Sequence, residues 1–408
     1  MHILYIHQYF ATPLGCTGTR SYEFARRWVA KGHKVTMLTT IAQLTSGDLA
    51  EARGLFLKRF TTAGIDVLAL RIPYRQQMGV FKRCLAFLAF LLSASVVVAF
   101  LRKGDVVYAT STPLIVGIPA LIAKKLGHKK LIFEERDHWL ASAIELNVLK
   151  NKFLINILSW LEKTIYDNSA AIIAVSEGIA EGIRQVVGEG KPVYVIPNSS
   201  DLDLFSPDID GSAIRQEKNW NDKLVLIHAG TMGRINALEF VIDVAERVRD
   251  YRDILFVLIG QGSNKGNLKR MVEELGLRNV EILPSVPKQQ LSAILVAADV
   301  VMAIIGKFPC VEKQASLNKF YDGLSSGRCV LLNYRGWQGK LLEDKNAGFG
   351  CRLCDVDEFV EKVLYLNSHR DKLIAMGQNA RRLAVERFDR DKLAAQALAQ
   401  IELALGKV

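Results

Sequence analysis

The sequence predicts an α/β protein of two doubly wound, Rossmann-like domains that face each other across a cleft. Strand-like apolar runs alternate with helical stretches along the chain, as expected for parallel strands joined by helical crossovers. The alternation starts again after residues 196–211, a stretch rich in Asp, Ser and Pro. At 408 residues, the chain is also longer than one hydrophobic core usually allows.

The first half supplies seven strand-like runs separated by helical stretches. Residues 19–31 illustrate the helices, because apolar side chains recur there at near-helical spacing and Gly32 can end the helix. The predicted strands of this half are 2–7, 34–39, 66–71, 105–109, 130–133, 170–175 and 192–196. The second half repeats the scheme with predicted strands at 224–228, 254–259, 280–283, 300–304, 329–332 and 350–353.

The composition indicates a folded protein with an anionic partner. Half of the residues are hydrophobic, and the net charge is +11. Such a charge favours nucleic acid, an acidic membrane surface or phosphorylated small molecules. Six cysteines are too few for a disulfide framework, and Cys351 and Cys354 have no second pair nearby to complete a zinc site. We therefore expect reduced thiols in a cytoplasmic protein and no metal.

Residues 84–101 form one membrane-like apolar segment, flanked by Lys82, Arg83, Arg102 and Lys103. A helix of this length reaches about 27 Å, slightly less than a typical hydrocarbon core. The predicted strands before and after it belong to one sheet, which argues against a membrane between them. A buried helix, or one that lies in the membrane surface, is therefore favoured over a helix that spans the membrane, an alternative that hydropathy alone leaves open.

Ligands of such sheets bind beyond the carboxyl ends of the strands, which directs attention to five loops. The first carries Gly15 and Gly18 before a helix start, a place where backbone amides favour an anion. Its spacing is not the G-x-G-x-x-G of dinucleotide-binding proteins, so a nicotinamide cofactor is disfavoured. The glycines are equally compatible with a long turn that binds nothing.

The second loop crowds five ionisable residues after the strand at 130–133. Crowding of this kind shifts pKa values and often marks a site of chemistry, although a solvated loop with an Arg–Asp pair gives the same pattern. The residues are Glu134, Glu135, Arg136, Asp137 and His138.

The three remaining loops belong to the second half. Arg234 stands beside a helix predicted to begin near Asn236 and can bind a phosphate through two hydrogen bonds. A glycine turn follows at 260–265. In the fifth loop we expect Ser316 to cap a helix, so that the Leu317 and Asn318 amides and the Lys319 ammonium point into the cleft.

Five segments, taken in order, resemble the retaining glycosyltransferases of family 4, and in particular the WbuB-like sugar transferases of bacterial O-antigen and capsule assembly. They are "MHILYIHQYFATPLGCTGTRSYEFARRWVAKGHKVTMLTT", "AVSEGIAEGI", "VIPNSSDLDLF", "HAGTMGRINALEFVIDVA" and "NKFYDGLSSGRCVLL". The resemblance covers nearly the whole chain. It implies a GT-B fold with an acceptor domain at 1–200, a nucleotide-sugar domain at 201–385, and a final helical segment at 386–408 that packs on the first domain.

Transferred residue by residue, the resemblance places Asp322 at the second glutamate of the family's Glu-x₇-Glu signature, which holds the donor ribose. Gln314 stands at the position of the first glutamate, and Glu312 lies two residues out of register. Thr231 occupies the place of the family's arginine, which leaves Arg234 and Lys319 as the diphosphate cations. The family's His-Asp pair is replaced by Arg136-Asp137, with His138 adjacent, and Asp137 is the candidate for orienting the reacting groups.

The resemblance implies transfer of a sugar from a UDP-linked donor, with retention and without a metal, to a lipid-linked or glycan acceptor. The enzyme would then work in the cytoplasm, on the inner face of the cell membrane. Two alternatives remain: a UDP-sugar 2-epimerase of the same fold, and a basic protein that binds nucleic acid or membrane without catalysis. The apolar segment favours the lipid-linked acceptor over the epimerase. Nucleic acid is disfavoured because no aromatic–basic interleaving or recognisable binding module is present.

Overall fold

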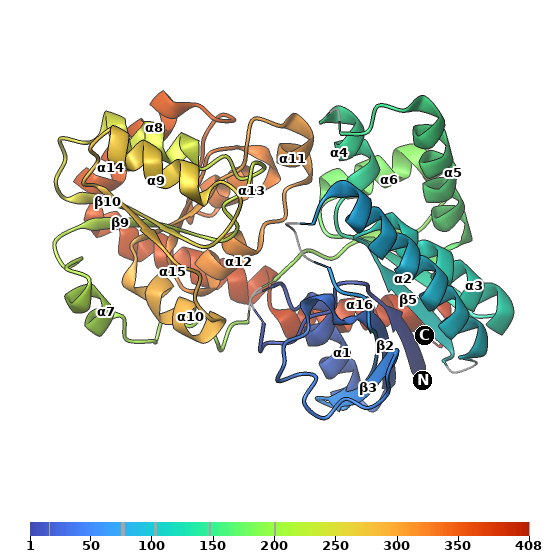
Figure 1. Cartoon of the computed structure of the whole chain (residues 1–408). Helices are drawn as coiled ribbons and strands as arrows, with labels where there is room; N and C mark the ends of the chain where they lie inside the picture. The colour runs from blue at the N-terminus through green and yellow to red at the C-terminus, as the bar shows by residue number, and fades with distance from the viewer. Residues whose placement is uncertain (16, 75–77, 102–103, 147, 200, 408) are drawn as a thin grey trace. The chain divides into compact units, whose positions relative to one another are not determined.

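The computed structural model describes residues 1–15, 17–74, 78–101, 104–146, 148–199 and 201–407 (Figure 1). The chain forms two compact units. Unit 1 comprises Met1–Pro197 and Asp391–Val408, and unit 2 comprises Asn198–Arg390. The chain thus passes into unit 2 near the predicted boundary at 200 and returns to unit 1 at residue 391, five residues beyond the predicted 386.

Unit 1 is built on an eight-stranded sheet with the order β3-β4-β2-β1-β5-β6-β7-β8, in which only the β3–β4 pair is antiparallel. Its strands are β1 (His2–Ile6), β2 (Lys34–Thr40), β3 (Leu57–Thr62), β4 (Ile65–Leu70), β5 (Val106–Thr110), β6 (Lys130–Glu135), β7 (Ala171–Ala174) and β8 (Val193–Val195). Its helices are α1 (Arg20–Ala30), η1 (Ile41–Gln43), α2 (Val80–Phe100), η2 (Leu114–Val116), α3 (Gly117–Gly127), α4 (Trp139–Glu145), α5 (Lys152–Asn168), α6 (Glu177–Val187) and α16 (Arg390–Ala404).

Unit 2 has a fully parallel six-stranded sheet with the order β11-β10-β9-β12-β13-β14. Its strands are β9 (Leu224–Ala229), β10 (Ile254–Ile259), β11 (Val280–Leu283), β12 (Val300–Ala303), β13 (Cys329–Leu332) and β14 (Gly348–Gly350). Its helices are α7 (Ser212–Glu217), α8 (Glu239–Arg247), α9 (Lys265–Glu274), α10 (Lys288–Ala297), α11 (Pro309–Gln314), α12 (Asn318–Ser325), α13 (Gly336–Asp344), α14 (Val356–Ser368) and α15 (Arg370–Arg387).

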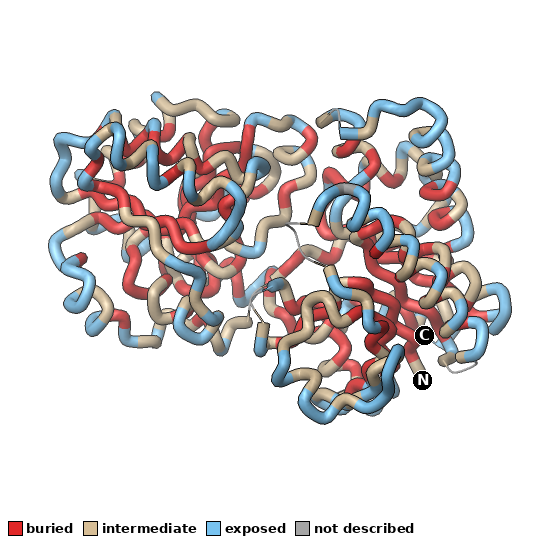
Figure 2. The backbone as a smooth tube through the Cα atoms, in the orientation of Figure 1, coloured by how far each residue is buried: buried red, intermediate tan, exposed pale blue. Residues whose placement is uncertain are grey.

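Both sheets are covered by helices, so the strands are buried while the outer helix surfaces are exposed (Figure 2). The predicted class of two doubly wound, Rossmann-like units is confirmed. In each sheet the strand order reverses beside the first strand of the unit, β1 or β9. Such a reversal opens a crevice at the carboxyl ends of the strands, where ligands of these folds bind.

Three sequence-based predictions about elements were wrong. Strand β3 was not predicted, because its alternation of polar and apolar side chains is that of an exposed edge strand. Glu134 and Glu135 lie inside β6 rather than in a loop, since buried hydrogen-bond donors satisfy their carboxylates. The last strand of unit 2 is 348–350, because the Gly348 backbone lies so close to Val330 that an added Cβ would be 1.9 Å from the Val330 carbonyl oxygen.

Candidate functional site

At the strand-order reversal of unit 2, the backbone loops after β9 and β10 pack directly on each other. A Cβ atom added at Gly260 would lie 1.9 Å from the Gly230 carbonyl oxygen, and one added at Gly262 would lie 2.1 Å from that of Met232. At Gly230 itself, the nearest atom to an added Cβ would be Cε of Lys319, at 3.2 Å. Glycine at these positions therefore brings the β9 loop against the first turn of α12.

Lys319 is a partly buried ammonium held by a neutral partner. Its Nζ donates a hydrogen bond to Oδ1 of Asn236 over 3.1 Å, and Nδ2 of Asn236 donates to the Thr231 carbonyl over 2.6 Å. Burial lowers the pKa of Lys319 to about 8. Within the described part of the chain, no carboxylate lies within ion-pair distance of this ammonium. Its charge is therefore not cancelled by the protein.

The start of α12 differs from the prediction for Ser316. Leu317 is the N-cap residue, and no side chain caps the helix, so the predicted Ser316 cap is wrong. The Ser316 hydroxyl instead bonds the hydroxyl of the buried Tyr321 over 2.8 Å, which turns it away from the helix amides. Leu317 is partly buried and Asn318 is exposed at this uncapped helix start, and Asp322 follows on the second turn, partly buried.

The loop before α12 is anchored by side chains from other elements. The Ser316 carbonyl accepts a hydrogen bond from Nδ2 of Asn198 over 2.9 Å, and the Ala315 carbonyl accepts one from Nε1 of Trp337 over 2.7 Å. Glu312 is engaged as well, since its Oε1 accepts from the Arg335 amide over 3.1 Å. Gln314 ends α11 and is partly buried.

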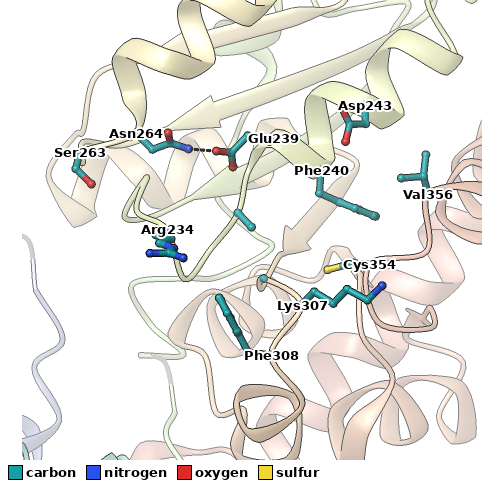
Figure 3. Close-up of a pocket in the computed structure, with 12 residues that line it drawn as sticks. Arg234, Glu239, Phe240, Asp243, Ser263, Asn264, Lys307, Phe308, Cys354 and Val356 are labelled. Atoms are coloured by element: carbon teal, nitrogen blue, oxygen red, sulfur yellow. Dashed lines mark hydrogen bonds between the residues drawn. The ribbon is translucent and has the colours of Figure 1, made fainter. Parts of the chain in front are cut away.

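A cavity of about 670 Å³ is lined by residues of the loops after β9 and β12 and of the first turns of α8 (Figure 3). Arg234 stands at one end of it, exposed, with the aromatic rings of Phe240 and Phe308 on the walls. Glu239 is fixed there by Nδ2 of Asn264 at 2.6 Å. The cavity therefore adjoins the loop after β9, which carries both Arg234 and Asn236, the hydrogen-bond partner of Lys319.

The site of unit 1 is built around a buried ion pair at the carboxyl ends of β5 and β6. Nε and Nη2 of Arg20 lie 3.0 and 2.9 Å from Oε1 of Glu134. Tyr108 donates to the same oxygen over 2.8 Å, and Thr110 donates to Oε2 over 2.7 Å. Burial alone would raise the pKa of Glu134, but Arg20, Arg136 and these hydrogen bonds outweigh it and lower the pKa.

Arg136 and Asp137 follow β6 and lie beside the residues that follow β5. The Arg136 amide donates to the Ser111 hydroxyl over 2.9 Å, and Oδ2 of the exposed Asp137 accepts from the Thr112 hydroxyl over 2.9 Å. The Arg136 guanidinium reaches the other way, with Nη1 3.4 Å from Nε2 of His7.

His138 turns away from Arg136 and Asp137 into the layer of helices α4, α5 and α6. Its Nε2 lies 3.6 Å from Oε1 of Glu162, and a Cβ added at Gly182 would lie 2.4 Å from its Nδ1. Burial lowers the pKa of His138 and raises that of Glu162 to about 7. Burial and the neighbouring Glu162 also raise the pKa of Glu135 well above its ordinary value.

The glycine loop after β1 is held in place by its own residues. The Gly15 amide donates to the Thr12 carbonyl over 3.1 Å, and the Thr12 hydroxyl donates to Oδ1 of Asp48 over 2.6 Å. Gly15 and Gly18 are both partly buried. A Cβ atom at Gly15 would meet only ordinary contacts, the nearest at 3.6 Å, so sterics do not demand glycine there.

The sequence analysis did not find His7, Ser21 or Asn236. His7 could have been found, because it directly follows the first strand at the carboxyl edge of the sheet. Asn236 was noted only as a helix start, whereas α8 begins at Glu239 and leaves Asn236 free to reach Lys319.

Two doubly wound units, each with polar side chains at its strand-order reversal, are the architecture of the GT-B class of proteins. The chain matches the family model described as glycosyl transferase 4-like domain over residues 15–199 and that of glycosyl transferases group 1 over residues 210–383. Together the two matches cover most of the chain. The chain therefore belongs to this family of glycosyltransferases.

Similar proteins agree with this assignment. A protein of Escherichia coli (strain K12), named as the colanic acid biosynthesis glycosyl transferase WcaI, is 22% identical over 307 residues, which cover 73% of this chain and 75% of that protein. Sucrose-phosphate synthase from Thermosynechococcus elongatus has a TM-score of 0.79 at 13% identity and full coverage of both chains. Anabaena HepE, solved with UDP and glucose, has a TM-score of 0.72 at 16% identity, over 99% of this chain and 100% of its own.

Proposed function

We propose that this glycosyltransferase moves a sugar, with retention of the anomeric configuration, from a UDP-sugar to a lipid-linked glycan acceptor in the assembly of a bacterial surface polysaccharide. The observation that carries the proposal is the Lys319 ammonium, which is desolvated and has an amide as its partner at the strand-order reversal of unit 2. The name of WcaI supports the role in polysaccharide synthesis, and the bound UDP of HepE supports the donor class.

In this proposal, Lys319, Arg234 and Asp322 of unit 2 and Asp137 of unit 1 have separate tasks. Sugar transfer breaks the bond between the anomeric carbon and the diphosphate, and the leaving diphosphate gains negative charge. Lys319, Arg234 and the uncapped amides of α12 stabilise that charge. Asp322 accepts hydrogen bonds from the ribose hydroxyls, and Asp137 orients the acceptor hydroxyl or the donor sugar beside the anomeric carbon.

The donor is tested with the full-length protein and a panel of UDP- and GDP-sugars, with the melting temperature as the readout. A true donor should raise it with ligand concentration, because a ligand that binds only the folded state stabilises that state. Product from that donor should then be analysed by NMR for the anomeric configuration. An inverted linkage would contradict retention, and a free epimer in place of a glycosylated lipid would favour the epimerase.

We expect sugar transfer to need no divalent metal, because cationic groups serve the diphosphate. The sequence contains Asp-x-Asp pairs, but two of them have structural tasks: Asp201 pairs with Arg390, and Asp355 caps α14. Initial rates measured in excess EDTA should therefore equal those measured in magnesium or manganese. A loss of activity in EDTA that either ion restores would contradict this expectation.

Helix α2 supports docking of the enzyme on an anionic membrane. It is long and apolar enough to cross a membrane, yet it is a crossover between two strands of one sheet. Phe90, Ala94 and Val98 pack into the core of unit 1. The opposite face exposes large apolar side chains, namely Phe81, Leu85, Leu88, Leu92, Val96 and Phe100. Lys82 and Arg83 lie at one end of the helix, while Arg102 and Lys103 at the other end lie outside the described residues.

We expect the double substitution Leu88→Ser and Leu92→Ser to weaken flotation with anionic liposomes at least fivefold. These side chains are 49% and 59% exposed, so the fold should survive. Ile374→Ser is the matched control, because Ile374 is 71% exposed but lies on α15 of unit 2.

Changing Lys82 and Arg83 to Glu should weaken binding further, and more so at low salt. If the protein bound neutral liposomes at high salt as strongly as it binds anionic liposomes, an electrostatic contribution to membrane binding would be refuted.

A further inference from the structure

His7 and Arg136 form a contact at the carboxyl edge of the unit 1 sheet that the proposed mechanism does not use. His7 follows β1 and is 2% exposed, and Arg136 follows β6 and is partly buried. Nη1 of Arg136 lies 3.4 Å from Nε2 of His7, and the Ser21 hydroxyl lies 2.8 Å from the Nδ1 atom of His7. The imidazole therefore bridges a guanidinium and a hydroxyl from α1.

The chemistry of the contact fixes the protonation of the imidazole. A guanidinium can only donate hydrogen bonds, so Nε2 must be the unprotonated nitrogen that accepts. The proton of neutral His7 then resides on Nδ1, which donates to the Ser21 oxygen. Burial and the charge of Arg136 both lower the pKa of His7 well below its ordinary value, in agreement with a neutral ring.

Because its partner His7 is neutral, the charge of Arg136 remains available. Arg20, at the same edge of the sheet, differs because its partner is a carboxylate. Arg20 is neutralised by two hydrogen bonds to Glu134. The four hydrogen bonds to Glu134 come from Arg20, Tyr108 and Thr110, so that carboxylate is already engaged. In the described ranges, no carboxylate lies within ion-pair distance of the Arg136 guanidinium. Among the described residues, Arg136 is thus a partly buried cation that forms no ion pair, and the more distant Glu134, whose pKa its charge helps to lower, is held by Arg20.

We propose that Arg136 is a binding site for a phosphate or diphosphate group in unit 1, and that His7, itself held by Ser21, is the residue that positions it. A guanidinium offers two parallel N–H groups to phosphate oxygens. Because His7 is a neutral acceptor, it orients the guanidinium without cancelling its charge, and that charge remains available to the ligand. The inference rests on the proposed function, which supplies two sources of such a group. One is the diphosphate of the nucleotide-sugar, and the other is the phosphate that joins an acceptor sugar to its lipid.

The test measures binding of two probes to the full-length protein by calorimetry: UDP for the donor source, and a short-chain polyprenyl diphosphate for the acceptor source. Arg136→Ala should lower the affinity for one of them at least tenfold, and the affected probe names the source. His7→Leu should lower the affinity for the same probe by a similar factor. His7→Gln should restore affinity to within about threefold of the original protein, because the glutamine side chain still offers an acceptor to Arg136.

Arg184→Ala is the matched control, because this arginine is paired with Glu177 on the surface of α6 and should leave both affinities unchanged. Ser21→Ala serves if His7→Leu does not fold, and it should weaken the affected probe by severalfold. Unchanged binding of both probes in Arg136→Ala would overturn the site. If His7→Leu folds and binds the affected probe as the original protein does, the positioning role of His7 is overturned. If His7→Leu does not fold, unchanged binding in Ser21→Ala overturns that role. Failure of sugar transfer with every donor would refute the proposed function but leave these binding results intact.

Discussion

Replacing Lys319 with Met should weaken UDP binding by about 1.5–3 kcal/mol, the usual worth of a charge-assisted hydrogen bond at a desolvated site. Met keeps the length and volume of the side chain but carries no charge. Uridine lacks the diphosphate, so its affinity should stay the same. Because the partner of Lys319 among the described residues is a neutral amide, removal of the ammonium should also leave the melting temperature unchanged or raise it. Calorimetry with both ligands and thermal unfolding measure the three effects.

The pH dependence of UDP binding gives an independent check on Lys319. Burial holds its pKa at about 8 in the free protein, and a bound diphosphate should raise that pKa. UDP affinity due to this group is therefore fully present below pH 8 and falls as the pH rises above 8. The Met variant should lack this fall. An equal fall in both proteins would assign the titration to another group.

Lys319 also has a predicted signature in protein stability. Its pKa in the folded protein lies below the ordinary value of 10.5, so the unfolded chain binds more protons between about pH 8 and 10.5. Below pH 8, this group therefore lowers the free energy of unfolding and destabilises the protein. As the pH rises from about 8 to 10.5, the destabilisation becomes smaller. The difference in stability between Lys319→Met and the original protein should shrink over the same window.

The second large effect is expected from Asp322→Asn, which should weaken binding of UDP and of uridine by the same amount. The amide fills the same space and accepts only one good hydrogen bond from the ribose diol, at a cost of about 1–3 kcal/mol. Equal losses for the two ligands would distinguish a ribose contact from a diphosphate contact. The melting temperature without ligand reports on the fold.

Asp344→Asn is the matched control for Asp322, because Asp344 is an exposed aspartate near the end of α13 in the same unit. It should change neither affinity. If Asp322→Asn also left both affinities unchanged, Asp322 would be a surface carboxylate of α12 without a role in donor binding. A loss for UDP alone would move Asp322 to the diphosphate.

Much of the fold could be predicted because hydrophobic periodicity is a local property. The runs at 254–259 and 329–332 coincide with β10 and β13, since continuous apolar segments between turns are typical of strands buried on both faces. The run at 280–283 coincides with the edge strand β11, although it contains the charged Glu281. The edge strands β3 and β14 were harder to predict, because β3 is half exposed and β14 contains glycines whose close packing no local pattern reveals.

The candidate sites were predicted in part, from the rule that ligands bind at the carboxyl ends of parallel strands. That rule directed attention to Arg136 and Arg234, which are found in the loops after β6 and β9. Lys319 lies at the start of α12, which follows helix α11 rather than a strand. The rule gave no information about hydrogen-bond partners. Ser316 illustrates the limit, because a serine before a helix commonly caps it, yet here the hydroxyl of the buried Tyr321 takes its hydrogen bond.

By itself, the sequence determined the alternating elements, the two units and the loops that bear charged residues, because each depends on neighbours within a few turns of chain. Only the tertiary structure decided which charges are neutralised and which remain available. Arg20 meets Glu134 from 114 residues away, Arg136 meets His7 from 129, and Lys319 meets Asn236 from 83. Charge and desolvation act through space, so the difference between a structural arginine and one ready for a phosphate exists only once the strands are side by side.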